Sequence, residues 1–75
     1  MPRLTVNGPG LRAARVQRGL TQQQLATLAD ITTARLRRLE KGDEGARLRT
    51  VGQLAGAVGV DPMDILVWEP EEDAE

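Results

Sequence analysis

Residues 21–42 constrain the fold of this chain more than any other stretch. Thr21, with Gln24 three positions later, has the pattern of a capping box, which marks a helix start. Thr32 is a second favourable N-cap residue, and Gly42 is typical of the position just past a helix end. The segment therefore predicts two short helices joined by a tight turn at Asp30–Ile31.

The second of these helices has two chemically different sides. At 100° per residue, Leu36 and Leu39 define an apolar side. The opposite side and its flanks carry the small and cationic residues Thr33, Ala34, Arg35, Arg37, Arg38 and Lys41. Arg35 opposes the helix dipole at the N-terminal end, and such a broken local rule suggests a functional role. The cations therefore form either a solvated basic face or a surface for the major groove of DNA.

The rest of the chain predicts further helices and no confident strand. Helices are expected from Pro9 to Gln17 or Arg18, over 49–58, and, after Asp61 as N-cap, from Pro62 to about Trp68. Inward-facing positions are Leu11, Ala14, Leu20, Leu25, Ala26, Leu28, Ala29, Val51, Leu54, Ala55 and Val58. We expect an all-α, five-helix domain over 9–68, an N-terminal arm over 1–8 that can be extended at Leu4–Val6, and a disordered acidic tail over 69–75.

Length and composition restrict the chemistry. Seventy-five residues make one domain at most. The chain has no cysteine and no histidine, so disulfides, thiolate chemistry and zinc sites are not expected. No stretch is apolar and long enough for a membrane span or a signal peptide. These features favour a cytoplasmic protein with no cofactor and no membrane association.

The net charge of -1 conceals an uneven distribution. Residues 1–68 carry ten bases and six acids, whereas residues 69–75 carry five acids and no base. The body is therefore basic, at +4, and the tail is acidic, at -5. Nine of the ten bases are arginines, which suit bidentate contacts with phosphates and guanine edges. The tail serves either as a solubilising end or as a weak screen over the basic face.

Several motifs in order carry a resemblance to a known family. They are Gly-Leu-Thr-Gln-Gln-Gln-Leu-Ala at 19–26, Ile31-Thr32, Leu36, Leu39-Glu40-Lys41-Gly42, and Leu54-Ala-Gly-Ala-Val-Gly-Val60. Leu11 to Leu66 resembles the Cro/C1-type, or Xre, helix-turn-helix domains of bacterial and phage repressors. The resemblance implies a lambda-repressor-like fold, with the helix-turn-helix at helices 2 and 3. It also implies a two-fold dimer on a double-stranded DNA operator with inverted half-sites.

The resemblance assigns roles to individual residues. Thr33, Ala34 and Arg38 match base-contacting positions, and Arg37 faces the same way. Gln22 matches a phosphate contact at the start of helix 2, and Arg35, Lys41 and Arg47 are the other candidate phosphate ligands. Arg15 and Glu40 match a partly buried salt bridge between helices 1 and 3. Glu40 can instead be a simple charge balance among the cations.

Two features depart from the family pattern. The loop after helix 3, which often contacts phosphate, here opens with the acids Asp43–Glu44, leaving Arg47 and Arg49 as possible substitutes. Arg47 also occupies the N-cap position of helix 4, where a small polar residue is usual. We therefore expect modest affinity for DNA, or a requirement for a dimer or a partner.

Two function classes remain and one is excluded. The leading hypothesis is a sequence-specific transcriptional regulator, and the alternative is an antitoxin-like or adaptor module that binds a protein such as a toxin. An enzyme is excluded, because the chain has no nucleophile–base pair and no glycine-rich phosphate loop. The expected dimer surface comprises Val60, Ile65, Val67 and Trp68, helped by the arm at Leu4–Val6.

Overall fold

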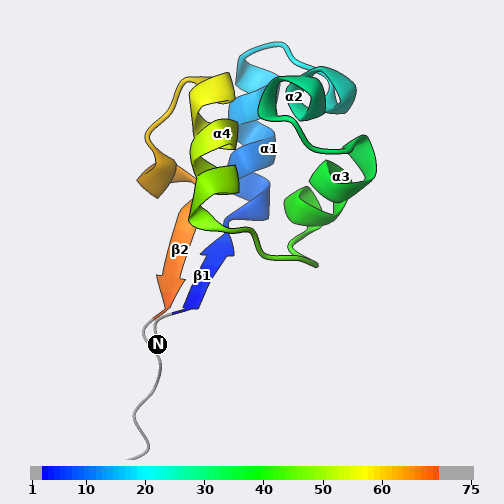
Figure 1. Ribbon diagram of the computed structural model, residues 1–75. Coiled ribbons are helices and arrows are strands. Elements are labelled where there is room, and N and C mark those ends of the chain that lie inside the picture. The colour runs from blue at the N-terminus through cyan, green and yellow to red at the C-terminus, as the bar shows by residue number, and fades with distance from the viewer. Residues whose placement is uncertain (1–2, 70–75) are drawn as a thin grey trace, which may run out of the picture.

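Four α-helices form the body of the molecule, and two short strands extend from it (Figure 1). The computed structural model describes residues 3–69, with the backbone alone at positions 3, 4, 68 and 69. In chain order the elements are β1 (Arg3–Val6), α1 (Gly8–Gln17), α2 (Gln22–Ala29), α3 (Thr33–Lys41), α4 (Leu48–Val58), the 3-10 helix η1 (Pro62–Asp64) and β2 (Leu66–Glu69).

The helix ends of α2 and α3 agree with the cap residues of the sequence. The Thr21 hydroxyl accepts a hydrogen bond from Gln24 N at 3.0 Å, and Gln24 Oε1 accepts one from Thr21 N at 2.8 Å. Thr32 caps α3 by accepting from Arg35 N at 3.1 Å. Asp30 ends α2 with φ of 60°, a left-handed conformation that Asn and Asp tolerate better than most residues. The predicted caps and the turn between these helices are confirmed.

The prediction of a fifth α-helix and of no strand is wrong. Asp61 does cap a helical start, but it is followed only by the single 3-10 turn of η1. The chain then becomes β2, which pairs antiparallel with β1, Val6 opposite Leu66 and Arg3 opposite Glu69. Asn7 N also donates to Ile65 O at 2.8 Å. β1 and β2 therefore satisfy each other's backbone N–H and C=O groups. If β2 were a helix, the backbone groups of β1 would lack this partner.

The core lies where α1, α2, α3 and α4 meet. Its fully buried large side chains are Leu11, Leu25, Leu36, Leu39, Val51, Leu54, Val58 and Ile65. Ala14 and Leu20 pack against this core from outside. Leu28, predicted to be buried, is 60% exposed, because α2 turns that face away from α3 and α4 and toward solvent. Aliphatic side chains of moderate size therefore hold the helices together.

The start of α1 lies very close to the end of α3. A Cβ added to Gly8 would collide with the backbone carbonyls of Leu39 and Glu40, the latter being the closest atom. Only a residue without a side chain permits this approach. The contact fixes the C-terminal end of α3 against α1, and thereby sets the direction in which the exposed face of α3 points.

Candidate nucleic-acid interface

α3 is anchored by one side and open on the other. Leu36 and Leu39 are fully buried, and Glu40 is buried beside them. Of the residues predicted to contact DNA, Ala34, Arg37, Arg38 and Lys41 are exposed, whereas Thr33 and Arg35 are half-buried. The apolar side thus holds the helix, and the cationic side faces solvent.

A polar network ties α3 to α1 and α2. Arg15 Nε donates to Glu40 Oε2 at 2.7 Å, and Arg15 Nη2 lies 3.3 Å from Glu40 Oε1. Arg15 Nη1 donates to Leu20 O at 2.9 Å, so all three of its nitrogens are bound. The side chains of Arg15 and Glu40 are only 12% and 5% exposed. The pair that the resemblance implied is therefore in contact, and it connects α1 with α3.

Gln22 belongs to the same network. Its Nε2 donates to Glu40 Oε1 at 3.1 Å, and its side chain is half-buried. Part of its amide is therefore used inside the protein rather than held free for a ligand. The second amide N–H and the amide oxygen are not used in that bond.

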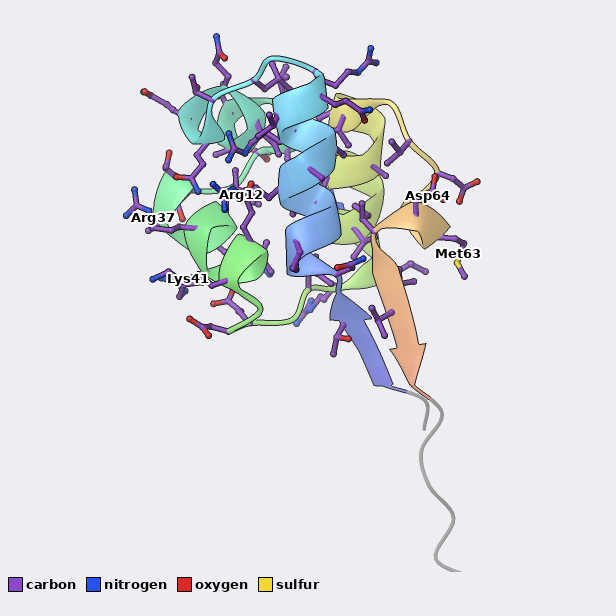
Figure 2. The ribbon with its side chains drawn as sticks, turned by 180° about the vertical axis from the view of Figure 1, so that it is seen from behind. Arg12, Arg37, Lys41, Met63 and Asp64 are labelled. Carbon is purple, nitrogen blue, oxygen red and sulfur yellow. The ribbon has the colours of Figure 1, made fainter. Side chains whose placement is uncertain are left out.

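A cationic groove lies between α1 and α3 at the start of α2. We call it the α1–α3 groove; it holds about 600 Å³ and is lined by Arg12, Arg15, Gly19, Leu20, Thr21, Gln22, Arg37, Glu40 and Lys41. Figure 2 shows Arg12 extending from α1 toward α3, on the same side of the molecule as Arg37 and Lys41. Met63 and Asp64 lie on the opposite side. The structure thus brings Gln22 and Lys41 together, with Arg12 and Arg37 beside them.

The remaining predicted phosphate ligands lie in a second hollow. Arg35 and Arg47 line it together with Arg49, Asp30, Ile31, Thr50 and Gln53, around a volume of about 400 Å³. We call it the α3–α4 hollow. Arg47 stands at the N-cap position of α4 and makes no side-chain cap hydrogen bond. A guanidinium has no acceptor atom and cannot cap the backbone N–H groups of α4, and the Arg47 side chain is exposed.

Glu44 bridges two of the α3 arginines. Its Oε2 accepts from Arg35 Nε at 2.9 Å, and its Oε1 accepts from Arg38 Nε at 2.7 Å. The hydrogen bond from Arg38, with the one from Arg35 and both positive charges, holds the pKa of Glu44 below its ordinary value of 4.5, against a smaller opposing effect of burial. Glu44 is therefore ionised at neutral pH.

Sequence reasoning missed two parts of this surface. Arg12 was not predicted, although it lies one helical turn before Arg15 and so shares its face toward α3. The acid Glu44 was expected to weaken phosphate binding, but its pairing with Arg35 and Arg38 was not foreseen. Helical spacing could not reveal it, because Gly42 reverses the chain between them, with φ of 82°.

Two other kinds of site, a metal centre and a membrane-spanning helix, are not found among residues 3–69. Within residues 3–69, no three His, Cys, Asp or Glu side chains gather as a metal ion would require. Every helix in that range falls short of the length and apolar character needed to cross a membrane.

Two solved structures with a similar fold are described as regulators. The restriction-modification controller protein C.AhdI from Aeromonas hydrophila is 30% identical, with a TM-score of 0.73 over 76% of this chain and 86% of that chain. The clp gene regulator ClgR from Corynebacterium glutamicum is 26% identical, with a TM-score of 0.73 over 76% of this chain and 61% of that chain.

A third likeness shows the fold alone. The enzyme HEPD from Streptomyces albus, solved with 2-hydroxyethylphosphonate and Fe(II) bound, is 23% identical, with a TM-score of 0.70. The match covers 85% of this chain but 17% of HEPD. No curated protein matches this chain.

The family assignment rests on the sequence match together with these folds. The helix-turn-helix family HTH_3 matches residues 11–65, which is most of the chain and includes α2 and α3. C.AhdI and ClgR are regulators by their own descriptions, and both cover about three quarters of this chain. This chain belongs to the HTH_3 family of helix-turn-helix DNA-binding proteins, the Cro/C1-type or Xre family.

Proposed function

We propose that this protein is a transcriptional repressor that inserts α3 into the major groove of a palindromic operator, with α2 and α3 as its helix-turn-helix. The observation that carries the proposal is the exposed cationic side of α3, opposite the buried Leu36 and Leu39. A helix held in this way presents side chains to base edges at a fixed angle. Family membership supports DNA as the ligand.

Four residues of α3 are assigned to base contacts. Arg38 is exposed and can donate two hydrogen bonds to guanine O6 and N7. Arg37 extends from the same helix on the outer side (Figure 2). Ala34 has no polar group and can contact a thymine methyl, and Thr33 borders it near the start of α3.

The two cationic hollows are assigned to the DNA backbone. Gln22 and Lys41, joined by Arg12, would contact phosphates on the side of the α1–α3 groove. Arg35 and Arg47 would contact phosphates on the side of the α3–α4 hollow. Both hollows border α3, so a helix in the major groove would have phosphate ligands on either flank.

The two-fold symmetry of operators leads us to propose a homodimer, with recognition helices about 34 Å apart. Its expected surface needs one correction, because Ile65 is 1% exposed and belongs to the core. Val67 is 40% exposed and Val60 is half-buried, so both remain candidates. The side chains of Trp68 and Leu4 lie outside the described residues. Sedimentation equilibrium with and without DNA tests the dimer, and a monomer under both conditions would rule it out.

Selection from a random pool of duplexes tests the main proposal. Wild-type protein should enrich one palindromic site, with affinity that falls steeply as salt rises. Arg38→Ala should change the preferred base at one position of each half-site. Met63→Ala, an exposed substitution on the opposite side of the molecule (Figure 2), should enrich the wild-type site. Equal enrichment of all duplexes by the wild type would exclude specific recognition.

Binding to a protein partner is a second candidate function. A cytoplasmic antitoxin or adaptor could bind a protein through one surface and DNA through another. It is supported by Leu28, which is exposed on α2 beside an apolar hollow of about 440 Å³ lined by Leu20, Gln23, Gln24, Thr27 and Leu28. A co-expressed toxin should copurify with wild type and be lost with Leu28→Glu. Retention of DNA binding by Leu28→Glu would show that the two surfaces are separate.

A further inference from the structure

Glu44 and the two arginines it bridges form a small, partly exposed cluster between α3 and the loop that follows it. The side chains of Arg35, Arg38 and Glu44 are 34%, 52% and 32% exposed. Arg35 and Arg38 are three residues apart, so they are neighbours on one helix face and repel each other. Each carboxylate oxygen of Glu44 accepts from a different arginine, which offsets this repulsion.

The two arginines use only part of their hydrogen-bonding capacity. Each donates to Glu44 through Nε, and no other side-chain hydrogen bond from either is present among the described residues. Arg15, by contrast, uses Nε, Nη1 and Nη2 within the protein. Within residues 3–69, the terminal nitrogens of Arg35 and Arg38, four N–H donors each, make no hydrogen bond, while the bond at Nε restrains the orientation of each guanidinium.

We propose that Glu44 is a specificity-determining residue, which orients Arg38 toward a guanine edge and, through its pairs with Arg35 and Arg38, reduces binding to DNA of any sequence. The inference rests on the proposed function. Guanine O6 and N7 are neutral acceptors, so an oriented arginine can bind them even when its charge is balanced by a carboxylate. Attraction to phosphates depends on charge, so Glu44 weakens non-specific binding more than specific binding.

The adjacent acid Asp43 provides a matched control. Glu44→Gln and Asp43→Asn each remove one negative charge from the same loop, but Asp43 forms no ion pair among the described residues. A charge effect alone would act equally through both positions. An orienting effect would act through Glu44 alone.

The test compares dissociation constants for the selected site and for an unrelated duplex of equal length, at two salt concentrations. Both variants should bind the unrelated duplex more tightly than wild type. Glu44→Gln should lower the ratio of specific to non-specific affinity by about tenfold, whereas Asp43→Asn should leave it unchanged within about twofold. Equal ratios for the two variants would overturn the inference.

A second measurement needs no DNA. In nitrogen-15 NMR spectra, the Nε–H protons of Arg35 and Arg38 should exchange slowly with water in wild type and in Asp43→Asn. They should exchange rapidly in Glu44→Gln, with an unchanged melting temperature because Glu44 lies in a half-exposed loop. Rapid exchange of both protons in wild type would also overturn the inference. If wild type enriches no site, the proposed function fails; if it does and the ratios are equal, only the role of Glu44 fails.

Discussion

Among residues 3–69, Glu40 and Glu44 each accept a hydrogen bond from an arginine at 2.7 Å, but in different surroundings. Arg15 Nε lies 2.7 Å from Glu40, and Arg38 Nε lies 2.7 Å from Glu44. The first pair is almost fully buried between α1 and α3, whereas the second is half-exposed at the end of α3. Distance alone therefore does not assign a role. Burial and the number of nitrogens used separate a structural pair from one that remains available to a ligand.

The largest expected effect concerns the buried pair Arg15–Glu40. Glu40→Ala leaves the buried guanidinium of Arg15 without its carboxylate, and it also removes the acceptor of Gln22. We expect the free energy of unfolding to fall by about 3–5 kcal/mol, measured by urea denaturation. Glu44→Ala should leave the unfolding midpoint nearly unchanged. Equal losses for the two variants would remove the distinction.

The next largest effect concerns Arg38, in the half-exposed pair Arg38–Glu44. Arg38→Ala should weaken binding to the selected operator by about 1–3 kcal/mol, because a bidentate base contact is lost. Its melting temperature should match wild type, since the side chain is half-exposed. Fluorescence anisotropy with a labelled duplex measures the affinity. If Arg38→Ala lowered the melting temperature but not the affinity for the operator, Arg38 would have a structural role like that of Arg15.

A smaller and sequence-independent effect is expected from the α1–α3 groove. Arg12→Ala should weaken binding to all duplexes alike and reduce the slope of log affinity against log salt by about one. The preferred sequence should not change, because a phosphate contact carries no base information. Affinity measurements on two unrelated sites over a salt series check this. A change limited to one site would make Arg12 a base contact.

The smallest effect concerns protonation of Glu44. Its pKa is lowered in the folded protein, chiefly by the hydrogen bond from Arg38. Its stabilising contribution is therefore fully present above the unfolded value of 4.5 and is lost as pH falls through the lower folded value. A carbon-13 carboxyl titration should give a midpoint below 4.5. Arg38→Ala should raise that midpoint more than Arg35→Ala does, and the reverse order would contradict the assigned geometry.

The sequence predicted the local parts of the fold well. Thr21, Thr32 and Gly42 mark helix ends through hydrogen bonds or backbone angles confined to a few neighbouring residues, so their signals are complete in the sequence. The spacing of Leu36 and Leu39 likewise identified the buried side of α3. In each case the signal lies in the sequence of one helix and its cap residues.

The non-local parts could not be predicted in the same way. β2 forms because Leu66 pairs with Val6 at the other end of the chain, and no pattern within 61–69 records that partner. Leu28 has helical spacing compatible with burial, yet no other helix covers it. Glu44 reaches Arg35 and Arg38 only because the chain reverses at Gly42. The roles of the candidate DNA-contacting residues remain predictions until binding is measured.

The pairing of β1 with β2 has a consequence for how this protein can be joined to others. Because Arg3 lies opposite Glu69, the chain enters and leaves the folded body at adjacent points (Figure 1). A peptide of a few residues would be enough to connect them. The molecule should therefore tolerate circular permutation, with new termini in the loop at 43–47. It could also be inserted into a loop of another protein without distorting either fold.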